Sequence, residues 1–112
     1  MSFEVRTIPT FERQAKLLSK KYPSFKKDLS DLFDKISQSP FQGTPLAKGF
    51  YKVRLSIKSN NKGKSGGARV ITFLRVNEEQ VVFTAIYMKS DAANISQKEL
   101  DSIFIELSFN QL

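Results

Sequence analysis

The sequence predicts an α+β protein in which one antiparallel sheet packs against a helical hairpin and a C-terminal helix. Two adjacent stretches near the N-terminus repeat apolar residues with the period of a helix, and another such stretch lies near the C-terminus. Between them, three stretches have the pattern of strands. With a short alternating segment at the start, the element order is β-α-α-β-β-β-α. We expect residues 1–112 to form a single domain, because this length is close to the commonest domain size.

The first strand and the first helix are predicted before residue 23. Residues 3–6 alternate apolar and charged side chains, which is typical of a short strand, and Pro9 closes it. Residues 11–22 then place apolar side chains at spacings of four, three and four, which predicts a helix with one apolar stripe. Thr10 is the expected N-cap of this helix.

The second helix has the clearest helical period in the chain. Ser24 is its expected N-cap, and Pro40 bounds it. Because the connection around Pro23 is short, we expect the two helices to lie antiparallel as a hairpin. The apolar stripe consists of Phe25, Leu29, Leu32, Phe33 and Ile36.

The strands of the sheet follow a predicted loop over residues 40–48. Residues 51–57 alternate, so that one face can enter a core while the other carries cations. A basic, glycine-containing loop leads to a strand over residues 68–76. A turn at residues 77–79 then leads to a strand over residues 81–87. The last two strands are apolar on both faces, which indicates that both sides of the sheet are at least partly covered.

The last helix begins with a capping box formed by Ser96 and Glu99. Its apolar stripe contains Leu100, Ile103, Phe104 and Leu107. A strand, a helical hairpin and a returning strand place the first two strands antiparallel, so we expect a sheet that is antiparallel throughout.

Positive charge is concentrated in one interval of the chain. No carboxylate lies between Asp34 and Glu78, and nine cations lie there, while the net charge of the whole chain is +7. This excess predicts a phosphate-binding surface on the sheet, and nucleic acid is the first candidate partner. A merely solvated basic face explains the charge alone about equally well. The nine cations are Lys35, Lys48, Lys52, Arg54, Lys58, Lys62, Lys64, Arg69 and Arg75.

Composition excludes several kinds of site. The chain has no cysteine and no histidine, so it has no disulfide framework, no thiolate metal site and no histidine acid or base. The sequence GKS at residues 63–65 lacks the earlier glycine of a nucleotide-binding loop and opens a strand instead of a helix. We expect neither a metal nor a small-molecule cofactor. The N-terminus does not resemble a signal peptide, and the run Val81 to Met88 is too short to span a bilayer, so we expect a cytoplasmic protein.

The candidate site residues come from separate strands. Lys52 and Arg54 lie about 7 Å apart on one strand face, where their repulsion favours a bound anion unless both side chains splay into water. Arg69 adjoins the basic loop and is the better phosphate candidate of its strand, whereas Arg75 can pair with Glu78 or Glu79 in the turn. If the last three strands are neighbours in order, Lys89 comes close to Arg69.

Two further residues near Lys89 have open interpretations. Tyr87 can stack on a base, although a core position with the hydroxyl at the rim is commoner for a tyrosine at a strand end. Asp91 can orient Lys89 or act as a base, although a surface turn residue is the more usual interpretation.

Nearly the whole chain resembles the RelE/HigB family of bacterial type II toxin–antitoxin toxins, within the RelE/ParE superfamily. The resemblance is carried by FYKVRLSI…KGKSGGARVITFL…VVFTAIYMKSDAANIS…EL, with KKYPSFKKDL upstream. It implies an mRNA endonuclease (mRNA interferase) that typically cuts messages on the ribosome, inhibits translation and is held inactive by a cognate antitoxin. We expect that antitoxin to be a helix-turn-helix protein.

The resemblance also implies site residues. Lys52 matches the family's lysine on the second strand, and Arg54 stands where some members have another lysine. Arg69 matches the arginine of the third strand, and Lys89 stands where RelE itself has an arginine. The tyrosine near the C-terminus of RelE toxins has no match here, since Tyr87 lies earlier in the chain.

Attack of a ribose 2′-OH on the adjacent phosphate requires a base, a group that stabilises the phosphorane and a proton donor to the 5′ oxygen. We assign Lys52 as the base, Arg54 and Arg69 to the phosphate and Lys89 as the acid, while the identity of the acid stays open. RNA-binding roles are assigned to Lys58, Lys62, Lys64 and Tyr87. The alternative function is that of a ParE-like gyrase poison or a non-catalytic nucleic-acid-binding module.

Overall fold

The computed structural model describes residues 2–60 and 67–109. Five strands form one sheet with the order β1-β5-β4-β3-β2. In chain order the elements are β1 (Glu4–Thr7), α1 (Pro9–Lys21), α2 (Phe25–Gln38), β2 (Thr44–Pro45), the 3₁₀ turn η1 (Ala47–Gly49), β3 (Phe50–Leu55), β4 (Ala68–Arg75), β5 (Gln80–Met88) and α3 (Gln97–Phe109). The predicted α+β order is confirmed, with β2 and η1 as additions inside the predicted loop over residues 40–48.

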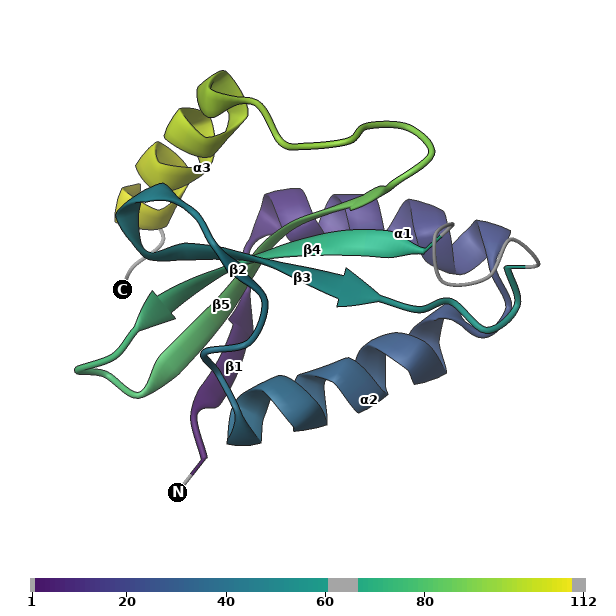
Figure 1. Cartoon of the computed structure of the whole chain (residues 1–112), viewed down its shortest axis with the longest axis horizontal. Coiled ribbons are helices and arrows are strands. Elements are labelled where there is room, and N and C mark those ends of the chain that lie inside the picture. Colours follow the sequence, from purple (N-terminus) through teal and green to yellow (C-terminus); the bar gives the residue numbers. More distant parts are fainter. Residues whose placement is uncertain (1, 61–66, 110–112) are drawn as a thin grey trace.

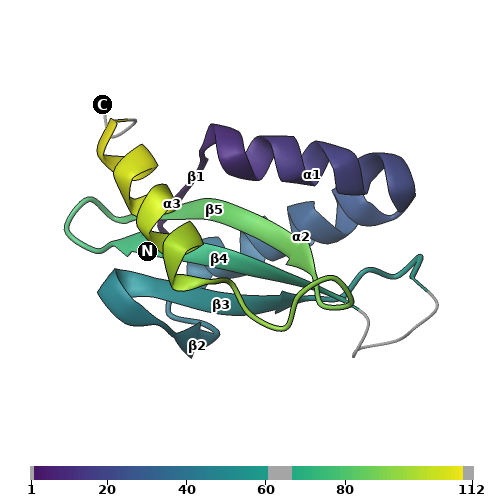
Figure 2. The same ribbon diagram turned by 90° about the horizontal axis from the view of Figure 1, so that it is seen from above.

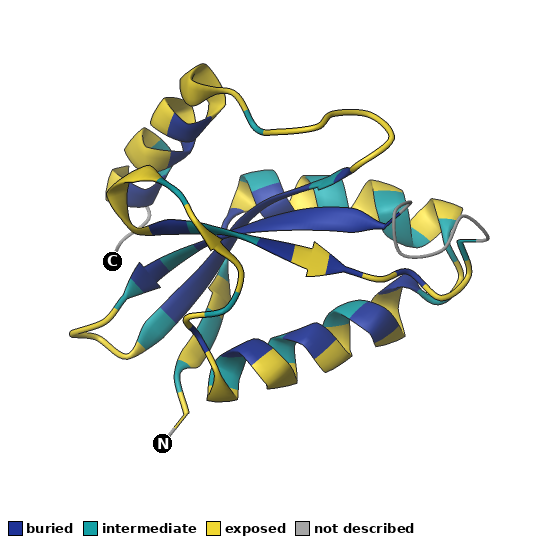
Figure 3. Cartoon of the chain, in the orientation of Figure 1, coloured by how far each residue is buried: buried dark blue, intermediate teal, exposed yellow. Residues whose placement is uncertain are grey.

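The helices lie on both sides of the sheet (Figures 1 and 2). α3 lies on one face and α2 on the opposite face, while α1 runs alongside β5. α1 and α2 form the predicted antiparallel hairpin. Phe83 of β5 is fully buried and makes edge-to-face contacts with Phe11 of α1 and Phe33 of α2, with ring centroids 5.6 and 4.7 Å apart. The expectation that both sides of the central strands are covered is therefore confirmed, and Figure 3 shows β4 and β5 as almost continuously buried.

The expectation of a sheet that is antiparallel throughout is wrong at one pair. β3, β4 and β5 form an antiparallel meander, but β1 pairs with β5 in parallel, with Val5 opposite Val81. The cause is β2, which pairs antiparallel with β3 through Thr44 and Lys52. The chain does return from the helical hairpin as an antiparallel strand, but that strand is the short β2, and the turn at η1 reverses the direction once more before β3.

The N-cap of α1 also differs from the prediction. Ile8 is the N-cap and Pro9 occupies the first helical turn, so Thr10 lies inside the helix. Proline is favoured there because its fixed φ matches the helix and its missing N–H would have no partner. The Thr10 hydroxyl instead donates a hydrogen bond to Glu106 of α3, which connects the first and last helices.

α3 begins with the predicted capping box. The Ser96 hydroxyl accepts the Glu99 backbone N–H at 3.1 Å, and the Ser96 backbone N–H donates to Glu99 Oε1 at 3.3 Å. Leu100, Ile103 and Leu107 are buried against the sheet. Within the described ranges, no helix is long and apolar enough to cross a membrane.

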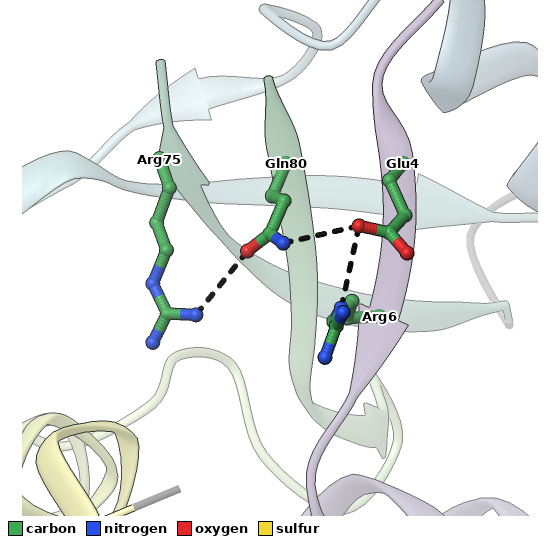
Figure 4. Close-up of polar contacts among 4 residues, drawn as sticks. All are labelled: Glu4, Arg6, Arg75 and Gln80. Carbon is green, nitrogen blue, oxygen red and sulfur yellow. Dashed lines mark hydrogen bonds and ion pairs between the residues drawn. The ribbon is translucent and has the colours of Figure 1, made fainter. Parts of the chain in front are cut away.

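Arg75 does not pair with Glu78 or Glu79. Its guanidinium donates to Gln80 Oε1 at 3.4 Å, and Gln80 Nε2 donates to Glu4 Oε1 at 3.0 Å, so one polar row crosses β4, β5 and β1 (Figure 4). The reason is the register, since Arg75 and Gln80 are direct partners and Gln80 is also the direct partner of Glu4. Arg75 therefore contributes to the end of the sheet opposite to Ala68, where β4 begins.

Candidate functional site

Two cross-strand rows bring the predicted cations onto one face of the sheet. Arg54, Arg69 and Tyr87 are direct partners across β3, β4 and β5, and Lys52 is opposite Ile71 in the next row. Direct partners in antiparallel strands point to the same face, so Lys52, Arg54 and Arg69 lie together. This is the face on which α3 lies, because the next row along the strands contains Phe50 and Phe73, whose rings contact Phe104 of α3.

A cavity of about 190 Å³ marks the place where these side chains meet. It is bounded by four cations, one hydroxyl and one alanine, and it has no carboxylate in its lining. We call it the cationic cavity. Its lining residues are Thr44, Lys52, Arg54, Arg69, Lys89 and Ala93. The structure thus places all four residues to which the sequence assigns catalytic roles around one space, from the two strands β3 and β4 and the segment after β5.

Lys52 is held by a residue that the sequence analysis missed. Its ammonium donates a hydrogen bond to Asn94 Oδ1 at 2.9 Å. Asn94 lies in the connection between β5 and α3, which crosses the sheet beside the cationic cavity. Asn94 and Lys52 are 42 residues apart, and no local pattern signals their contact.

Thr44 was also missed, because it lies in the segment predicted as a loop. It is the direct partner of Lys52 in β2 and lines the cationic cavity. β2 pairs with β3 through only two residues, so no periodic pattern in the sequence signals this strand.

Arg69 is the most deeply placed cation of the site, with only 5% of its surface exposed. Its guanidinium donates to the carbonyl oxygen of Ala68 at 3.0 Å, and it forms no ion pair with any described residue. Burial of an arginine without an anionic partner is costly, so the arrangement favours a bound anion at the cavity. The hydrogen bond to the carbonyl oxygen of the preceding residue also restricts the orientation of the Arg69 side chain.

Tyr87 packs at the margin of the core beside Arg69. Its hydroxyl oxygen is buried and makes no well-formed hydrogen bond with a described group, although the backbone of Ile95 lies nearby. Burial raises the pKa of the Tyr87 hydroxyl above its ordinary value, and the positive charge of Arg69 partly opposes this shift. The ring therefore occupies the core position that the sequence analysis considered as the alternative to base stacking.

Lys58 lies away from the cationic cavity. It follows β3, its side chain is exposed, and its backbone N–H donates to Asp28 Oδ2 at 2.9 Å. Asp28 is buried and also accepts the hydroxyl of Ser24 at 2.7 Å, so this carboxylate joins the start of α2 to the end of β3. Lys62 and Lys64 lie outside the described residues.

Asp91 is an exposed turn residue and forms no ion pair with Lys89 in the part of the chain that the structure describes. Lys48, another cation of the basic interval, pairs with Asp101 of α3 at 3.8 Å. Among residues 2–60 and 67–109, no group of three or more acidic side chains is arranged to hold a metal ion.

A protein-family model described as the RelE toxin of the RelE/RelB toxin–antitoxin system matches residues 9–108. No curated protein sequence matches the chain. Solved structures do match, and one of them is a double arginine-to-alanine mutant of E. coli toxin RelE in the free state. The two chains cover 100% of each other with a TM-score of 0.57 and 13% sequence identity, which shows a shared fold. Since the family model spans nearly the entire chain, including β3, β4 and β5 with the cations around one cavity, this protein belongs to the RelE toxin family.

Proposed function

We propose that the protein is an mRNA endonuclease that cuts translated messages on the ribosome in the cytoplasm and so inhibits translation. The observation that carries the proposal is the cationic cavity, in which four positive side chains converge without a carboxylate. Such a site matches the chemistry of phosphodiester cleavage, because the transition state bears more negative charge than the substrate. Membership of the RelE toxin family supports the same function.

In the proposed reaction the ribose 2′ oxygen attacks the adjacent phosphorus, and the bond from phosphorus to the 5′ oxygen breaks. Lys52 in its neutral form takes the 2′-OH proton, and Lys89 supplies a proton to the leaving 5′ oxygen. Arg54 and Arg69 donate to the non-bridging oxygens of the phosphorane, which is a role suited to permanently charged, forked donors. Asn94 positions the Lys52 amine through the hydrogen bond at 2.9 Å.

We further propose that the cognate antitoxin, a helix-turn-helix protein, blocks the reaction by covering the cationic face with an acidic or helical segment. The face is suited to such a partner because Arg54 and Lys89 are exposed and unpaired among the described residues. Complementary charge accelerates association and selects the partner.

The proposal is tested by inducing the toxin in cells and mapping a reporter mRNA by primer extension. We expect breaks within translated codons for the wild type, and their loss in the double variant Lys52→Ala/Arg69→Ala. Lys26→Ala is the matched control, because Lys26 is an exposed lysine of α2 that does not line the cationic cavity. Intact mRNA together with a DNA-damage response would contradict the proposal and favour a gyrase-directed poison.

A further inference from the structure

A second cavity adjoins the cationic cavity across the edge of β3. Its volume is about 360 Å³, within the range of small-ligand sites of about 300–1,000 Å³. Thr44, Lys52 and Arg54 line both cavities, so the two spaces share one wall. The second cavity also reaches Leu32 and Lys35 of α2. We call it the α2 groove.

The α2 groove continues the cationic cavity from one face of the sheet towards the other. The cationic cavity lies on the face that carries α3, whereas α2 lies on the opposite face (Figure 1). β2 ends its pairing with β3 at Thr44 and Lys52, and no described strand covers the edge of β3 beyond that point. A chain bound at the cationic cavity can therefore pass over the open edge into the groove.

The backbone before β2 lies directly against β3 at Gly43. Gly43 has a φ of +95°, and a Cβ atom at this position would clash with the carbonyl oxygen of Lys52. Only glycine adopts such a conformation with so close an approach. The segment with Gln42 consequently lies directly against β3 and forms one wall of the groove.

The lining of the α2 groove has the chemistry of a nucleotide site. Lys35 and Arg54 are exposed, form no ion pair with a described residue and can contact a phosphate. Leu32, which is 7% exposed, contributes a small apolar surface, and Gln42 supplies an amide that can donate to and accept from a base edge. The groove has no carboxylate in its lining, which suits a polyanion.

We propose that the α2 groove is a second nucleotide subsite, which binds the first nucleotide beyond the two that flank the scissile linkage of a single-stranded RNA. Its phosphate lies between Lys35 and Arg54, and its base lies against Leu32 within reach of Gln42. This inference rests on the proposed function, because it extends the path of the same RNA. Lys35 and Gln42 are then binding residues for the neighbouring nucleotide and take no part in proton transfer.

The test measures binding of 2′-fluoro RNA, which lacks the attacking hydroxyl, as a dinucleotide and as a hexanucleotide. The dinucleotide has one phosphodiester and occupies the cationic cavity alone, whereas the hexanucleotide also reaches the groove. In about 0.1 M salt, Lys35→Ala is expected to weaken hexanucleotide binding roughly fivefold and to reduce the salt slope by about 0.7, as for one lost single-strand phosphate contact. Dinucleotide binding is expected to stay unchanged. Gln42→Ala is expected to weaken only the hexanucleotide as well.

Lys26→Ala is the matched control, because it removes the same charge from an exposed position of the same helix that lines neither cavity. Equal losses for Lys35→Ala and Lys26→Ala would overturn the subsite and indicate a general charge effect. Unchanged hexanucleotide binding in Lys35→Ala, with mRNA cleavage intact in cells, would overturn the subsite while leaving the proposed function in place. A wild-type protein that binds neither RNA and cuts no mRNA would overturn both.

Discussion

Arg54 and Arg69 are direct partners across β3 and β4, so two arginines of like charge lie side by side on the same face. Among the described residues neither forms an ion pair. Like charges directly opposite each other destabilise a sheet. The pair is therefore better suited to binding an anion than to stabilising the fold.

Replacing Arg54 should separate the repulsion between the two arginines, which affects stability, from their role in binding an anion, which affects activity. Arg54→Gln is expected to raise the free energy of unfolding by at most about 0.5 kcal/mol, since Arg54 is exposed and water screens the repulsion. The gain should shrink in 0.5 M salt, and mRNA cleavage should fall. Urea unfolding at low and high salt measures the first effect, with the exposed Arg13→Gln as control. A loss of stability in Arg54→Gln would contradict the repulsion.

Replacing the other cations should affect catalysis in different ways. Lys52→Ala removes the proposed base and is expected to reduce the cleavage rate by about 10²–10⁴-fold. Arg69→Lys keeps the charge but loses the forked donors, so we expect it to reduce the rate by about 10²-fold. Both rates are measured with a translated message in a purified translation system. Cleavage at the wild-type rate in Arg69→Lys would show that geometry at this position is unimportant.

The contact between Lys52 and Asn94 predicts a change in pH dependence. Asn94→Asp places a carboxylate beside the Lys52 ammonium and favours the charged form, so the pH–rate profile is expected to move to higher pH. Asn94→Ala is expected to lower the rate about tenfold without this movement. A pH profile from pH 6 to pH 10 distinguishes positioning from a purely structural role, in which both variants would change stability alone.

The burial of the Tyr87 hydroxyl predicts that part of the loss of stability at alkaline pH comes from this residue. Burial raises the pKa of Tyr87 in the folded protein above its value of about 10 in the unfolded chain. The folded state therefore keeps this proton to a higher pH than the unfolded chain does. The contribution of Tyr87 to the free energy of unfolding is fully present below pH 10 and is lost as the pH rises through the pKa of the folded state. Tyr87→Phe should flatten the loss of stability above pH 10 and remove the latest component of the absorbance titration at 295 nm. An unchanged absorbance titration in Tyr87→Phe would show that the tyrosine with the raised pKa is not Tyr87.

The buried carboxylate of Asp28 predicts a stability difference between two variants. Asp28 Oδ2 accepts hydrogen bonds from the Ser24 hydroxyl and the Lys58 backbone N–H. Asp28→Ala leaves the Lys58 backbone N–H without its acceptor and is expected to cost about 2 kcal/mol. Asp28→Asn retains an acceptor oxygen and should cost less. Urea unfolding measures both, and an equal cost for the two variants would show that the charge, and not the acceptor, matters.

The sequence alone determined the α+β class, the helical hairpin, the capping box of α3 and the alternation that separates Val53 and Leu55 from Lys52 and Arg54. These features depend on residues close together in the chain, whose spacing matches the period of a helix or a strand. The meander of β3, β4 and β5 was predictable for the same reason, because its strands are neighbours in sequence. That meander is sufficient to bring Arg69 and Lys89 near Lys52.

Only the tertiary structure decided the parallel pairing of β1 with β5, the burial of Arg69, the contact between Lys52 and Asn94 and the groove beside Lys35. Each depends on where distant segments pack, and packing is set by the complementary shapes of whole elements and not by any local period. The short strand at Thr44 shows the reason most simply. It pairs with β3 through only two residues, too few to leave a pattern, yet it reverses the chain and sets the direction of β3 in the sheet.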